Sequence, residues 1–157
     1  MATADRSVAT GTDPVPALEF VFEAKVAIGE TLIIAKSKYG ERRVVPITGG
    51  TFEGPRMQGE VLPGGADWQL VRADGDMELD ALYVLRVSDG ALIYVRNRAL
   101  VHIPKGTADM SQIYVRTAPE FEAASDGPHA WLNHGVFVGK LALANPGQVT
   151  IRFHRVG

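Results

Sequence analysis

The sequence contains no cysteine, so disulfide bonds and metal sites built on thiolate ligands are excluded. It has no apolar run close to the roughly 18 residues that a membrane span requires. Basic residues are not in excess either, since 16 Lys and Arg stand against 18 Asp and Glu, for a net charge of −2. Nucleic-acid-binding domains carry a basic surface, so we expect neither a nucleic acid nor a membrane as partner.

Helical patterning is also scarce. Apolar residues never recur at helical spacing over about 11 positions without an intervening Gly or Pro. Residues 1–13 are rich in Ala, Thr, Ser and Asp and lack the apolar segment of a signal peptide, so we interpret them as a mobile tail and expect a cytoplasmic protein. The remaining residues, 14–157, have the length of one domain.

Strand signals are frequent instead. Apolar residues alternate with polar ones from Leu18 to Val26, as in a half-buried strand. The hairpin signals Asp74-Gly75 and Asp89-Gly90 divide residues 67–103 into a predicted three-stranded meander, and residues 134–144 and 148–156 form a predicted closing hairpin. The segment 117–124 fits an extended strand or a short helix, and residues 127–133 fit one helical turn that buries Trp131.

The pattern as a whole predicts an all-β protein. About eight to ten mostly antiparallel strands that close into a single barrel leave no exposed sheet edges, and a β-sandwich is the alternative. The predicted strand 134–144 is apolar on both faces, with Val136 and Val138 on one face and Phe137 and Leu141 near the other. An apolar face on the outside of a barrel is unfavourable in water unless a partner covers it, so we expect a homo-oligomer.

Short motifs in a fixed order resemble a known family. They are Ile47–Pro55, Gly59–Trp68, Leu79–Ala81, Ser88–Ala91, Arg116–Pro119, Trp131–Asn133 and Phe137–Gly139, and Gly64-Gly65-Ala66-Asp67-Trp68 is the most specific of them. Their order resembles the bacterial family called domain of unknown function 3237, from about Pro16 to the C-terminus. The resemblance implies a single β-barrel, similar in outline to allene oxide cyclase and dirigent proteins, and supplies no catalytic residue. Where the resemblance implies a glycine after Arg98, this chain has Ala99.

Asp67 and Trp68 are the first candidate pair for a site. They follow two glycines at the start of a predicted strand, where a carboxylate beside an indole in a barrel mouth acts as a general base once apolar walls raise its pKa. The alternative is structural: Asp67 caps a turn while Trp68 fills the core. We take Asp67 as the candidate catalytic residue and Trp68 as a candidate ligand contact.

Tyr94, Arg96 and Arg98 alternate along one predicted strand and therefore share a face. Inside a barrel they form a wall that binds anions, and outside they form a solvated face paired with acidic residues. Trp131 and Asn133 combine an aromatic wall with an amide and are further candidate ligand contacts; alternatively Trp131 is a core residue and Asn133 a turn residue. The four histidines show no metal-binding spacing, so we expect no metal and no cofactor.

Three functions fit these observations. The first is a cofactor-independent isomerase, cyclase or lyase that acts on a small, partly apolar or aromatic molecule. The second is a barrel that binds or carries such a molecule without reaction, and the third is a structural module with a packed interior. Cavity volume separates the third function from the others, and an ionisable group facing the cavity separates the first from the second.

Overall fold

A computed structural model describes residues 14–107 and 109–157. The prediction of a mobile tail for residues 1–13 lies outside the described residues. In these described residues two short 3-10 helices, η1 (Met110–Gln112) and η2 (Ala130–His134), occur among strands. The strands are β1 (Leu18–Ile28), β2 (Leu32–Ser37), β3 (Gly40–Glu53), β4 (Gln58–Val61), β5 (Gly65–Val71), β6 (Met77–Val87), β7 (Leu92–His102), β8 (Tyr114–Glu122), β9 (Val136–Asn145) and β10 (Gln148–Val156).

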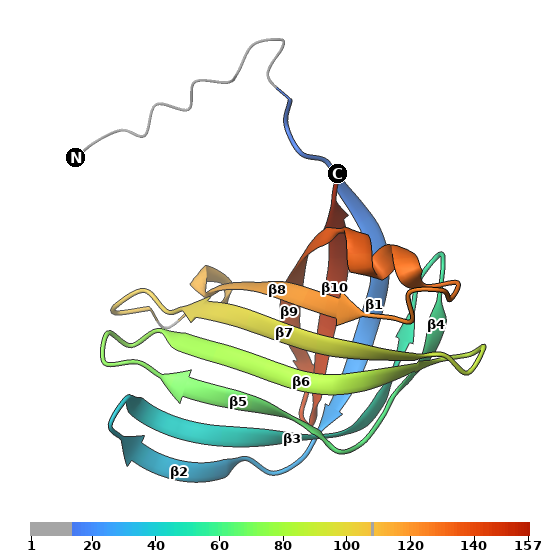
Figure 1. Cartoon of the computed structure of the whole chain (residues 1–157). Coiled ribbons are helices and arrows are strands. Elements are labelled where there is room, and N and C mark those ends of the chain that lie inside the picture. The colour runs from blue at the N-terminus through green and yellow to red at the C-terminus, as the bar shows by residue number, and fades with distance from the viewer. Residues whose placement is uncertain (1–13, 108) are drawn as a thin grey trace.

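The strands close into one antiparallel barrel (Figure 1). Going around the ring, β1 pairs with β10, and β9, β8, β7 and β6 follow in order. The short strands β4 and β5 both lie between β6 and β3, and β3 pairs with β1 to complete the closure. β2 adds to the outer edge of β3. The predicted closed barrel is therefore confirmed, and the alternative β-sandwich is not formed.

The turns follow the local sequence signals. Asp74-Gly75 joins β5 to β6 and Asp89-Gly90 joins β6 to β7, and both glycines have φ of 92°, which residues with a Cβ rarely adopt. β8 shows that residues 117–122 are extended, so the strand interpretation is correct there. The predicted helical turn exists as η2, but it buries Leu132 rather than Trp131, which stays half-buried.

β7 passes through Ala99 as regular strand. Among the described residues the one non-glycine residue with positive φ is Ala35, so the backbone at Ala99 does not need a glycine conformation. Ala35 lies at a bulge in β2, and a bulge bends an edge strand away from further pairing.

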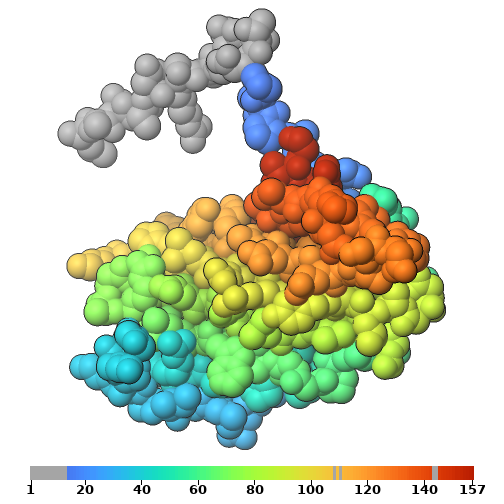
Figure 2. All heavy atoms as spheres, viewed as in Figure 1, coloured from blue at the N-terminus to red at the C-terminus, as the bar shows by residue number. Residues whose placement is uncertain are grey.

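The two ends of the described chain meet beside each other on the barrel. Leu18 pairs with Val156, and the Gly157 N–H donates to the Ala17 carbonyl. The start of β1 and the end of β10 are therefore joined by hydrogen bonds. Figure 2 shows the adjacent blue and red segments and, next to them, the ridge formed by η2 and its flanking loop in orange. No helix in the described part of the chain is both long and apolar enough to cross a membrane.

One end of the barrel interior is filled by aromatic side chains. Phe22, Phe121 and Phe153 pack with ring centroids 4.5 to 5.8 Å apart, and Phe52 and Phe137 extend the cluster. Phe22 and Phe153 are fully buried. Toward the other end the same strands carry smaller inward residues, such as Val26 and Thr117, and the interior there is not filled.

Candidate functional site

A cavity of about 300 Å³ occupies the unfilled end of the barrel interior. Its lining is mostly aliphatic, and the polar side chains in it are those of Asp67, Gln69, Tyr83, Asn97 and Thr117. Ile103, just beyond β7, lines the cavity and is 40% exposed, which places the mouth at this end. A concave, largely apolar space with a few polar groups is the usual make-up of a small-molecule site.

A break in strand pairing places the Asp67 carboxylate. β5 and β6 pair at Asp67 and Ala81 and resume only at Leu70 and Glu78. Within this break the Asp80 N–H donates to Asp67 Oδ1 over 3.0 Å, and the side chain of Asp67 faces the cavity. Asp67 therefore accepts a backbone hydrogen bond from the neighbouring strand β6 while its side chain still borders the cavity.

Gln69, itself held by Arg43, donates to the second carboxylate oxygen of Asp67. Gln69 Nε2 donates to Asp67 Oδ2 over 2.9 Å, and Arg43 Nε donates to Gln69 Oε1 over 3.1 Å. Because the guanidinium donates to the amide oxygen, the amide nitrogen of Gln69 is directed at Asp67. Arg43 also contacts Met77 Sδ at 3.4 Å, so its guanidinium is engaged on this wall.

The charge state of Asp67 reflects opposing effects. Burial raises the pKa of the Asp67 carboxyl above its ordinary value, the hydrogen bonds from Gln69 and the Asp80 N–H oppose this rise, and the charge of Asp80 adds to it. Burial and the neighbouring Asp67 also raise the pKa of the Tyr83 hydroxyl well above its ordinary value. Tyr83 is therefore a neutral hydroxyl, and Asp67 is the group in this cavity suited to exchange protons.

Of the residues predicted for the site, Asp67 alone lines the cavity. Its neighbour Trp68 lies on the opposite face of β5 and is 47% exposed, because successive strand residues point to opposite sides. Tyr94, Arg96 and Arg98 lie on the outer face of β7 for the same reason. Arg96 forms a two-point ion pair with Asp80 at 3.0 and 2.9 Å, which is the solvated-face arrangement and not a wall of the cavity.

Trp131 and Asn133 lie at the aromatic end of the barrel, away from the cavity. Trp131 packs near Phe137, and the Arg56 guanidinium lies 3.8 Å from the centre of its ring. Asn133 accepts from the Ala123 N–H over 2.8 Å and donates to the Ala123 carbonyl over 2.9 Å, so it ties η2 to the end of β8. The shared pocket expected for Asp67, Trp68, Trp131 and Asn133 is not formed, because Trp68 points outward and Trp131 and Asn133 lie at the aromatic end, away from the cavity that Asp67 lines.

Sequence reasoning missed Gln69, Tyr83, Asn97 and Thr117. A signal for Asn97 was present, because it continues the alternation of Ile93 and Val95, the face expected to be apolar. A polar residue on such a face is either satisfied by the protein or directed at a ligand. The prediction for this strand was based on the flanking Arg96 and Arg98, which lie on its other face.

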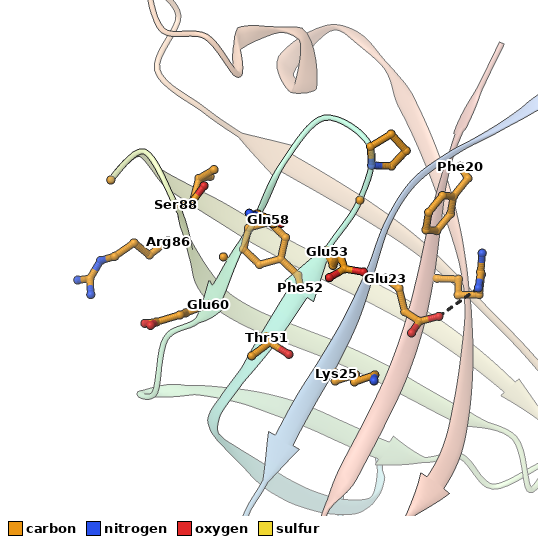
Figure 3. Close-up of a pocket in the computed structure, with 16 residues that line it drawn as sticks. Phe20, Glu23, Lys25, Thr51, Phe52, Glu53, Gln58, Glu60, Arg86 and Ser88 are labelled. Atoms are coloured by element: carbon orange, nitrogen blue, oxygen red, sulfur yellow. Dashed lines mark hydrogen bonds and ion pairs between the residues drawn. The ribbon is translucent and has the colours of Figure 1, made fainter.

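A second hollow lies on the outside of the barrel over β1, β3, β4 and β6 (Figure 3). It is wide and open, at about 1190 Å³. Its charged side chains have both signs, and Glu23 is paired with Arg152 at 3.1 Å. In the described part of the chain no cluster of His, Cys, Asp or Glu is arranged to hold a metal ion. The interior cavity, which the Asp67 carboxylate faces, is the better candidate for chemistry.

Comparison with known proteins places the chain in a family. The family described as protein of unknown function (DUF3237) matches residues 16–156. The chain belongs to this family. This DUF3237 chain is 36% identical to a UPF0311 protein of Rhodopseudomonas palustris over 152 residues, 90% of this chain and 98% of the relative. A UPF0311 protein of Clostridium acetobutylicum is 33% identical over 148 residues, 88% of this chain and 92% of the relative.

Solved structures extend the comparison. A conserved protein of unknown function from Rhodopseudomonas palustris superimposes with a TM-score of 0.82 at 35% identity, covering 92% of this chain and 100% of that chain. A hydroalkoxylation enzyme of Penicillium herquei is 36% identical over 94 residues, which are 59% of this chain and 62% of that enzyme. The crystal structure of an enzyme from the same fungus gives a TM-score of 0.72 at 28% identity, covering 94% of this chain and 99% of that chain.

Proposed function

We propose that this protein is a cofactor-independent enzyme that closes an ether ring in a small, mostly apolar molecule, with Asp67 as the group that moves the proton. The observation that carries the proposal is the Asp67 carboxyl, held by Gln69 and the Asp80 N–H, facing an aliphatic cavity. The relative named as a hydroalkoxylation enzyme supports the reaction type. A barrel that only carries the same molecule is the competing function.

The proposed step adds a hydroxyl of the substrate across an alkene of the same molecule. The protonated Asp67 carboxyl donates its proton to one alkene carbon, and the hydroxyl oxygen bonds to the other carbon. The hydroxyl proton then returns to the Asp67 carboxylate, so nothing is oxidised or reduced and the product is an isomer of the substrate. Burial favours the protonated carboxyl that starts this cycle, because it raises the pKa of Asp67.

The test uses phenols that carry an ortho alkenyl chain, incubated with the protein in deuterated water. Chiral chromatography and mass spectrometry measure the cyclic ether. We expect an excess of one enantiomer and one deuterium on carbon, since the catalysed addition takes its proton from an exchangeable group. Asp67→Asn removes the titrating proton with little change in shape, and we expect it to lower the rate about 100-fold or more, the usual range for a lost general acid or base.

The matched control is Asp126→Asn, which changes the same side chain at an exposed position in the loop before η2. This variant should react at the rate of the parent protein. Racemic product formed equally by the parent, Asp67→Asn and protein-free samples would contradict the proposed enzyme. Tight binding of the phenols without any ring closure would support the carrier function instead.

A further inference from the structure

Three residues that line the cavity each carry a buried oxygen atom with no hydrogen-bond partner among the described residues. These atoms are the side-chain oxygens of Tyr83, Asn97 and Thr117, whose residues are 4%, 4% and 2% exposed. Most buried polar atoms in native proteins are hydrogen-bonded, because leaving one unpaired costs the free energy of its desolvation. Three such atoms on residues that line one cavity point to a partner from outside the protein.

Strand register brings the three residues together. On the inner wall Asp67, Ala81 and Asn97 lie on one row across β5, β6 and β7. Tyr83 is the next inward residue of β6 on one side of this row, and Thr117 of β8 lies diagonally from Asn97 on the other side. Diagonal neighbours on one face of a sheet are about 7–8 Å apart, so Asn97 lies near both Tyr83 and Thr117. Ala81, with only a methyl group, leaves space between Asp67 and Asn97.

A glycine on the neighbouring strand β9 leaves space for the Thr117 hydroxyl. Thr117 of β8 is paired with Gly139 of β9. A Cβ added to Gly139 would lie 2.3 Å from Thr117 Oγ1, closer than two such atoms approach. Any larger residue at Gly139 would therefore displace the hydroxyl from the position it holds.

We propose that Tyr83, Asn97 and Thr117 form a binding site for one neutral hydroxyl group of an otherwise apolar substrate. Asn97 Oδ1 is an acceptor only and requires a donor, while the Tyr83 and Thr117 hydroxyls both donate and accept. A substrate hydroxyl satisfies this set, since it donates once and accepts from the others. This inference rests on the proposed function in one respect: the hydroxyl that these residues bind is the one that adds to the alkene beside Asp67.

The charge of the cavity excludes anions as its ligands. None of the described lining residues is Lys, Arg or His, and Asp67 is on the same wall. Arg43, the cation bonded to this wall, is engaged by Gln69 and Met77. An anion buried here would have no countercharge, which is strongly unfavourable.

The test measures binding and not turnover, so its failure is separable from failure of the proposed reaction. Four probes share one aromatic body: naphthalene, 2-methoxynaphthalene, 2-naphthol and 2-naphthoate. Their affinities are measured by fluorescence titration against the whole chain. We expect 2-naphthol to bind about tenfold tighter than naphthalene and 2-methoxynaphthalene, the worth of a buried hydrogen bond that needs a donor, and 2-naphthoate to bind weakest.

Variants then assign the effect to the three residues. Thr117→Val, Asn97→Leu and Tyr83→Phe each replace the polar group with an apolar one of similar branching. Each should weaken 2-naphthol about fivefold to tenfold, leave naphthalene within about twofold, and leave the ligand-free protein at least as resistant to heat as the parent. Thr117→Ser keeps the hydroxyl and should retain 2-naphthol binding. Thr51→Val is the matched control, because Thr51 is exposed in the outer hollow (Figure 3).

Three outcomes would overturn the proposal. One is equal affinity for 2-naphthol, its methyl ether and naphthalene, which would mean that no hydroxyl is recognised. Another is tightest binding of 2-naphthoate, which would make this an anion site. The third is an equal loss of naphthalene and 2-naphthol in variants that remain folded, which would assign the three residues to the shape of the cavity.

Discussion

The two ends of the barrel interior are built from the same strands but are filled differently. At one end β1, β8 and β10 contribute Phe22, Phe121 and Phe153, whose rings interlock. At the other end the same strands turn smaller residues inward, among them Val26 and Thr117, and the cavity remains. The aromatic end supplies apolar burial, and the aliphatic end leaves space for a ligand.

The polar atoms divide between the ends in the same way. At the aromatic end Asn133 makes two hydrogen bonds to the backbone of Ala123, so its amide is used by the fold. At the cavity end Asn97 buries an amide oxygen with no partner among the described residues. Two asparagines of one chain thus differ, since the amide of one is used by the fold and the buried amide oxygen of the other is left unpaired by the described residues.

The largest effect should come from the aromatic end. Phe153→Ala removes a fully buried ring that contacts Phe22 and Phe121, and we expect it to lower the free energy of unfolding by about 3–5 kcal/mol. Leu79→Ala on the cavity wall should lower it by no more than about 2 kcal/mol, because Leu79 already borders open space. Urea unfolding measures both. A cost for Leu79→Ala equal to that for Phe153→Ala would remove the contrast between the ends.

Asn133→Ala should have a smaller effect, on stability alone. It removes two hydrogen bonds at an exposed position, so we expect a loss of about 1–2 kcal/mol in the free energy of unfolding. Ring closure and 2-naphthol affinity should stay at the parent level, because Asn133 does not line the cavity. A clear loss of binding in a variant that remains folded would restore Asn133 as a ligand contact.

Much of the fold was predictable because short-range signals agree with one another. The inward face of β6, from Met77 to Val87, follows from period-two alternation, and the two Asp-Gly turns fix the meander around it. The site was less predictable. Sequence indicates that Trp131 and Asp67 follow turns or loops, but only the closed register shows that Asp67 lies on the cavity wall while Trp131 lies at the aromatic end. The unpaired hydroxyl of Thr117 depends on Gly139 of another strand, which no local pattern reveals.

The third prediction concerns pH. The folded-state pKa of Asp67 is raised, so between about pH 4, near the pKa of an unfolded-chain Asp, and the folded value the native state binds more protons. The contribution of Asp67 to stability is therefore fully present below about pH 4 and is lost as the pH rises through the folded pKa. Asp67→Asn lacks this loss, so the stability of the variant minus that of the parent should increase from pH 4 to pH 8 in urea unfolding.

Asp126→Asn provides the reference for this pH dependence, because it removes an exposed carboxylate. Its difference from the parent should change little over the same range. A constant difference for Asp67→Asn, or one that decreases with pH, would show that burial does not control the titration of Asp67 and would weaken its role as proton donor.

The smallest effect is expected on the outer face of the cavity wall, one residue away from Asn97. Arg98 points outward from β7 and is exposed, so Arg98→Gln should change the free energy of unfolding by no more than about 0.5 kcal/mol. The affinity for 2-naphthol should stay within about twofold of the parent, whereas Asn97→Leu, on the inner face, lowers it. The two positions are adjacent, and their side chains point to opposite faces of β7. Equal losses of affinity in both variants would mean that the wall responds as a whole and that its inner face does not determine binding.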